Sequence, residues 1–146
     1  MNSTLLIVTL AVGAPALKDA PGAEASIVGE WVVESTTYAG RTRPYAGSQL
    51  RYVFTADGKW KIFRGEDQDG ENQGYRTDSK ATPWRIDLRS DATRTDVAPL
   101  HGIYKVEGDT LTLCYGREAS AARPTAFAAP RGSDVIMYVL KQVKKD

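Results

Sequence analysis

Apolar and polar residues alternate along most of the chain, which is the pattern of strands that bury one face of a sheet. These runs are rich in the β-branched and aromatic residues that favour strands. They cover residues 31–38, 50–55, 59–64, 74–77, 83–88, 100–106, 110–115 and 135–140. The pairs Asp57-Gly58 and Gly108-Asp109 stand between successive runs and are typical of hairpin turns.

Short strands that follow one another at regular spacing predict an all-β sandwich or barrel. Because consecutive runs are joined by hairpin signals, we expect a small antiparallel up-and-down barrel of about eight strands. The barrel domain is expected to cover residues 27–143. The acidic stretch 65–74 is interpreted as a solvated hairpin tip, with Ca²⁺ binding as the alternative because Ca²⁺ prefers oxygen ligands.

Residues 1–25 differ from the rest of the chain. Residues 5–12 read LLIVTLAV, an apolar run too short to cross a bilayer and of the right length for the core of a signal peptide. Two A-x-A patterns follow, at 14–16 and 23–25, although residues 1–4 lack the usual basic side chain. We therefore expect a signal peptide and linker over 1–25, an exported (periplasmic or secreted) protein, and no membrane span in the mature chain.

The charge balance and the scarcity of reactive side chains exclude several functions. Lys and Arg number 19 against 18 Asp and Glu, which argues against a nucleic-acid-binding surface. The single cysteine, Cys114, cannot form an internal disulfide and is expected to be a buried, inert thiol. His101 is the single histidine and is expected on the surface or rim. We predict no catalytic residues, no metal site and no cofactor.

Four motifs occur in order along the chain: G-x-W at 29–31, P-x-x-I-D-L at 83–88, G-I-Y-x-x-x-G-D-x-L-x-x-C at 102–114 and R-P-x-x-F at 123–127. In this order they resemble the lipocalin-like domain of unknown function found in exported proteins of planctomycete bacteria. The motif residues that we single out as structural are Gly29, Trp31, Asp87, Gly102, Tyr104, Gly108, Asp109, Cys114, Arg123, Pro124 and Phe127.

The resemblance covers nearly all of the chain after residue 26 and implies a lipocalin-like barrel without assigning it any activity. It implies that Trp31 closes one end of the barrel and that Arg123 stacks over its ring. Asp87 lies between two apolar positions of its strand, so it faces the opposite side from them. There it either pairs with a basic side chain on a neighbouring strand or faces water.

Aromatic residues in the barrel interior carry the functional hypothesis. Trp60, Trp84 and Tyr104 are the candidates for lining a cup that holds a small hydrophobic molecule. The alternative is an interior filled by these side chains. In that case the protein would act as an interaction or structural module that binds an envelope protein through its surface. We expect a monomer in either case.

Overall fold

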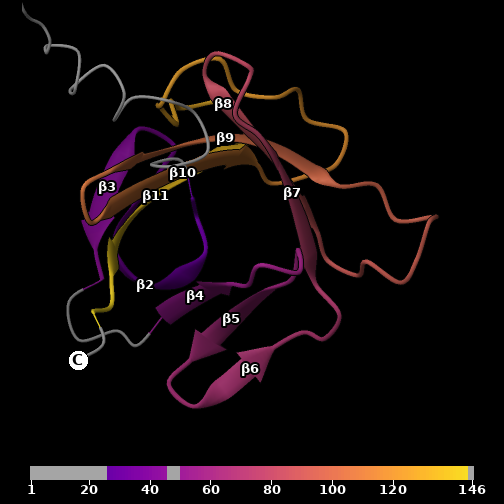
Figure 1. Ribbon diagram of the computed structural model, residues 1–146. Coiled ribbons are helices and arrows are strands. Elements are labelled where there is room, and N and C mark those ends of the chain that lie inside the picture. The colour runs from indigo at the N-terminus through magenta and orange to yellow at the C-terminus, as the bar shows by residue number, and fades with distance from the viewer. Residues whose placement is uncertain (1–25, 46–49, 145–146) are drawn as a thin grey trace, which may run out of the picture.

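The computed structural model describes residues 26–45 and 50–144, and they form one antiparallel sheet curled into a half-barrel (Figure 1). No helix long and apolar enough to cross a membrane occurs among them. The predicted all-β class is confirmed. The ten strands are β2 (Gly29–Tyr38), β3 (Arg41–Pro44), β4 (Leu50–Phe54), β5 (Trp60–Arg64), β6 (Asp67–Asp69), β7 (Gly74–Asp78), β8 (Trp84–Arg89), β9 (Leu100–Glu107), β10 (Thr110–Gly116) and β11 (Val135–Gln142).

The strands follow one another around the sheet almost as they do along the chain. Their order is β6-β5-β4-β2-β11-β10-β9-β8-β7, so the first long strand pairs with the last. The sheet is open between β6 and β7. At one end the gap narrows, where Trp60 N–H donates to Gln73 O at 3.1 Å and Tyr75 N–H donates to Gly58 O at 2.8 Å. These contacts bring the two sides of the sheet together.

The strand number differs from the predicted value of about eight because two polar stretches pair with their neighbours. β3 forms a hairpin with the end of β2, although all four of its residues are exposed. β6 lies in the acidic stretch 65–74, where we expected a hairpin tip, and pairs with β5 from Ile62 to Arg64. Neither strand buries an apolar face, so neither has the alternation that marks a half-buried strand in the sequence.

One contiguous core fills the concave side of the sheet. Alternate residues of the long strands point inward, as their sequence pattern predicts. Trp31 is 1% exposed, and its indole Nε1–H donates to Ile27 O at 2.9 Å. The buried cluster consists of Ile27, Trp31, Val33, Leu50, Tyr52, Phe54, Trp60, Ile86, Leu88, Tyr104, Leu111, Leu113, Tyr115 and Leu140.

Aromatic rings make up one side of this core. Phe54 stacks on Trp60 with ring centroids 6.0 Å apart, and Tyr52 lies 5.6 Å from the same indole. The Trp60 Nε1–H donates to the backbone oxygen of Arg89 at 3.2 Å. Tyr138 lies 5.5 Å from Tyr52. Such ring pairs stabilise the fold beyond the effect of burying their apolar area.

Candidate functional site

The long connection between β10 and β11, residues 117–134, lies over the outer face of the sheet. Figure 1 shows it above β9 and β10 in the upper part of the view. The outward-facing Cys114 is buried beneath it, with Sγ 3.5 Å from Ala128 O and 3.7 Å from Ala126 O. Burial raises the pKa of the Cys114 thiol, which keeps it protonated and inert. The segment thus forms a cover on the side of the sheet opposite to the core.

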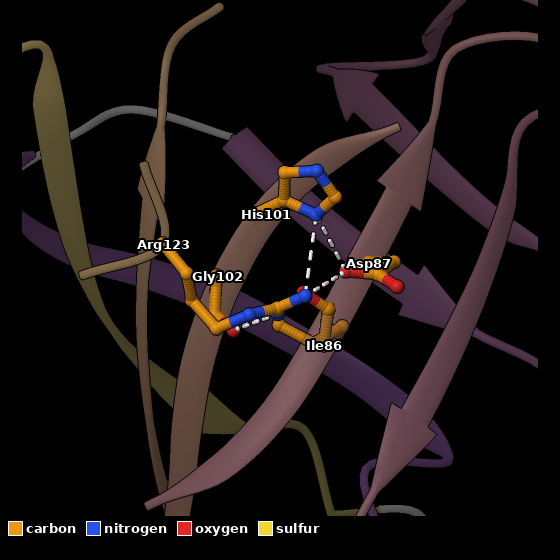
Figure 2. A network of polar contacts seen from close by, with 5 residues as sticks. All are labelled: Ile86, Asp87, His101, Gly102 and Arg123. Carbon is orange, nitrogen blue, oxygen red and sulfur yellow. Dashed lines mark hydrogen bonds and ion pairs between the residues drawn. The ribbon is translucent and has the colours of Figure 1, made fainter. Parts of the chain in front are cut away.

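Arg123 fastens this cover to β8 and β9 (Figure 2). Its guanidinium donates to Gly102 O at 2.8 Å and to Ile86 O at 3.1 Å, and to the Asp87 carboxylate at 2.7 Å. It also lies 3.2 Å from His101 Nδ1. One side chain of the cover therefore contacts the backbone and side chains of two adjacent strands.

The expected stacking of Arg123 over Trp31 is wrong. Among the described residues, the cation–π contacts join Arg51 to Phe63, Lys105 to Phe127 and Arg117 to Tyr38. Arg123 lies on the convex face of the sheet and Trp31 is buried in the core on the concave face. The G-x-W and R-P-x-x-F motifs consequently serve different parts of this fold.

Asp87 is the centre of charge in the network. It pairs with Arg123 and with His101 on neighbouring β9, at 2.7 and 3.0 Å, so the first of the two predicted alternatives is confirmed. Partial burial alone would raise the pKa of Asp87, but the hydrogen bonds from His101 and Arg123 and the positive charge of Arg123 outweigh that effect and lower the pKa. The carboxylate therefore stays ionised and remains paired with Arg123 of the cover.

Gly102 allows the strands beneath the network to approach closely. A Cβ built on Gly102 would lie 2.7 Å from Tyr115 Cβ and 2.8 Å from Cys114 O, distances that no real side chain tolerates. Tyr115 and Gly102 are direct partners in the β9–β10 register. The glycine of the G-I-Y motif is therefore required by packing, and its carbonyl is free to accept from Arg123.

Three further motif residues, Gly29, Gly108 and Asp109, lie at strand ends or in turns. Gly29 has φ of +143°, a conformation that other residues rarely adopt, and lies against the indole of Trp31. Gly108 has φ of +63° in the turn between β9 and β10. A hydrogen bond from the Lys141 ammonium, 3.3 Å away, lowers the pKa of Asp109 in the same turn. Pro124 is half-buried in the cover.

An apolar groove of about 290 Å³ opens where β8 begins. The pairing of β8 with β9 starts at Trp84 and Tyr104, whereas β9 continues to Glu107. A notch therefore remains beside the last three residues of β9. Trp84 and Tyr104 form one wall, with ring centroids 5.6 Å apart. Phe127 of the cover forms another. The further apolar lining comes from Ala81, Pro83 and Val106.

Lys105 supplies the polar rim of this groove. Its ammonium lies 4.9 Å from the centre of the Phe127 ring and 3.6 Å from a Glu107 carboxylate oxygen. The cation–π contact holds the phenyl ring against β9. The walls of the groove therefore belong to β8, β9 and the cover. The contacts of Arg123 and Lys105 hold the cover in place.

Two of the three predicted ligand-binding residues, Trp84 and Tyr104, lie side by side along this groove, although Tyr104 is itself 1% exposed and part of the buried core. The third, Trp60, lies elsewhere, packed into the core against Phe54. The sequence did not single out Lys105 or Val106 as lining residues, although their place in β9 beyond Tyr104 follows once the strand ends are known. Phe127 was expected only as a structural motif residue.

Two other candidate sites, the acidic stretch 65–74 and His101, both contact arginine side chains. Within residues 26–45 and 50–144, no group of three or more His, Cys, Asp or Glu comes together to hold a metal ion. In the acidic stretch, Asp69 is paired with Arg64 at 2.6 Å. His101 is partly exposed, as predicted, and its Nδ1 is engaged by Asp87 and Arg123 while the other ring nitrogen points away from them (Figure 2).

Comparisons with known proteins find no matching family model, no similar curated protein and no similar solved structure.

The role of Arg123 can be tested through the thiol it protects. We expect Arg123→Gln to raise the rate at which Cys114 reacts with a disulfide reagent by about tenfold or more, because hydrogen bonds to a charged group each contribute about 1.5–3 kcal/mol. Cys114 is the one cysteine of the chain, so the rate reports this site alone. Arg131→Gln is the control, since Arg131 is an exposed arginine of the same segment. Equal rates in both variants would contradict the fastening role.

Proposed function

We propose that this chain binds a small apolar molecule in the groove between β8, β9 and the cover. The observation that carries the proposal is the convergence of Trp84, Tyr104 and Phe127, from three separate segments, on one open groove of about 290 Å³. That volume is at the low end for ligand pockets. Aromatic walls with one cation at the rim suit a flat or aromatic molecule.

Three of the four motifs contribute to this groove, which supports the proposal. Pro83 and Trp84 open the second motif, Tyr104 ends G-I-Y, and Phe127 ends R-P-x-x-F. Asp87 and Arg123, from the same motifs, hold the cover that carries Phe127. The motif residues thus build and brace one feature of the molecule.

The proposal extends to the context of the domain. We propose a lipocalin-like protein that is exported behind residues 1–25, which lie outside the described residues. The antiparallel meander in which β2 pairs with β11 supports the lipocalin-like part, since up-and-down barrels pair their first and last strands, although this sheet stays open between β6 and β7. In this proposal the ligand site is the groove at the edge of β8 and not a cup inside the barrel.

A neutral apolar dye tests the binding site. We expect N-phenyl-1-naphthylamine to bind the wild-type protein with increased fluorescence, and Trp84→Ala to weaken its affinity by about tenfold, because a large aromatic contact area is lost. Phe127→Ala should weaken it as well. Phe63→Ala, which removes a ring on β5 outside the groove, is the matched control.

Thermal unfolding of each variant should accompany the titration, so that a loss of fold is not taken for a loss of binding. If the dye does not bind, or if the control weakens binding as much as the two groove variants, the groove is not the site. The protein would then be better explained as an envelope interaction module that works through its surface.

A further inference from the structure

A second hollow, of about 240 Å³, lies on the outer face of β7 and β8 and differs in chemistry from the groove. It lies near the end of β8, whereas the groove lies at its start. Its polar lining comes from Arg76, Asp87 and Arg89. It is smaller than most ligand pockets, which suits a small ion or a small polar group.

Small residues keep this pocket open and backbone hydrogen bonds hold its walls. Gly58, Gly74 and Ala92 contribute no bulky side chain to it. Tyr75 N–H donates to Gly58 O at 2.8 Å, and Ala92 N–H donates to Asn72 O at 2.7 Å. A Cβ on Gly74 would lie only 2.7 Å from the Ala92 Cβ. The walls are therefore fixed by the sheet and by the loop after β8.

Two arginines face this pocket from adjacent strands. Arg76 is paired with Asp87 in the β7–β8 register, which places Arg89, two residues further along β8, diagonally across from it. Diagonal neighbours on one face of an antiparallel pair are about 7–8 Å apart, within reach of long side chains. Arg89 is held in place by donating to Val97 O at 3.0 Å, which leaves its other N–H groups available.

The carboxylate that lines the same pocket is already neutralised. Asp87 Oδ1 accepts from Arg123 at 2.7 Å and contacts His101 at 3.0 Å, both on the side of β9. Arg76, by contrast, is exposed on β7, and among residues 26–45 and 50–144 its side chain takes part in no ion pair or hydrogen bond. The pocket therefore keeps an uncompensated positive charge from Arg76 and Arg89.

We propose that this pocket binds a small oxyanion, the phosphate or carboxylate group of a small molecule, between Arg76 and Arg89. Guanidinium groups match the geometry of both anions and can donate two parallel hydrogen bonds to them. The Arg123–Asp87–His101 network takes part indirectly, because it cancels the one negative charge that would repel the anion. The site is independent of the apolar groove.

Calorimetric titration of the whole chain with inorganic phosphate, and separately with acetate, tests the site while chloride holds the ionic strength constant. We expect binding of at least one anion, with the preferred anion identifying the ligand class. Arg76→Gln should weaken that binding by about tenfold. The control is Arg85→Gln, which removes the same charge from an exposed position on the same outer face of β8 outside the pocket. It should change affinity less than twofold.

Amide chemical shifts give a second readout that does not depend on the variants. Anion binding should move the resonances of Gly58, Gly74 and Ala92 more than those around the apolar groove. The absence of binding to either anion would overturn the proposal. So would equal weakening by the two arginine variants, or shifts spread evenly over all exposed basic residues, since each would mean that only overall charge matters.

Discussion

Replacing Trp31 by alanine is expected to lower the free energy of unfolding by about 3–5 kcal/mol, the usual cost of removing a large buried ring. Trp31 is 1% exposed and is one of the largest fully buried side chains of the described core. The substitution leaves a cavity between strands and also removes the donor that satisfies the Ile27 carbonyl. Chemical denaturation followed by circular dichroism measures the change.

Trp31→Phe provides the graded control. It keeps an aromatic ring but loses the indole N–H, so the expected loss of stability lies clearly below that of Trp31→Ala. A loss of less than about 0.5 kcal/mol for Trp31→Ala would mean that Trp31 does not anchor the core, because surface substitutions have effects of that size.

The second large effect is a loss of stability in alkaline solution. Burial raises the pKa of Tyr52 well above its ordinary value of 10.0 and raises that of Tyr115 as well. Their hydroxyl oxygens lie 3.4 Å apart within the core. Both phenols therefore stay protonated in the folded protein at a pH at which they ionise in the unfolded chain.

The raised pKa values mean that the free energy of unfolding falls as the pH rises above 10. The stabilisation is fully present below pH 10, where both states are protonated, and is lost as the pH rises from there towards the folded-state pKa values. Each tyrosine contributes a fall of about 1.4 kcal/mol per pH unit in the free energy of unfolding over this window. Urea unfolding between pH 9 and 12 measures the slope.

Tyr52→Phe removes one of the two buried phenols without removing its ring. The variant should have a shallower slope than the wild type above pH 10, by about 1.4 kcal/mol per pH unit. Identical slopes for the two proteins would show that Tyr52 ionises as easily in the folded state as in the unfolded chain.

The long strands could be predicted from sequence because each buries one face. Leu50, Tyr52 and Phe54, for example, alternate with half-exposed residues in β4. β3 and β6 could not be predicted, because what defines them is pairing with β2 and β5 and not burial of their own side chains. Pairing between polar stretches leaves no periodic signal in the sequence.

The residues of the candidate sites could be predicted in part from the sequence, but their contacts could not. Motif residues such as Asp87 and Arg123 stood out, but their contact joins positions 36 residues apart, and Arg123 lies in a long connection with no regular structure. The face that Asp87 occupies follows from alternation, whereas the partner that reaches it depends on the path of the cover. Trp60 illustrates the same limit, because alternation places a ring inside without telling a filled core from a cup.

The opening between β6 and β7 has a consequence for self-association. Unpaired strand edges are templates on which a second chain can add a strand and begin to aggregate. β6 is only three residues long and two of them are aspartates, while β7 carries the exposed charges Arg76 and Asp78. A second copy docking on the β6 edge would bring like charges together and lose their hydration. The same charged, short edges that leave the barrel incompletely closed thus protect it from growing into a continuous sheet between molecules.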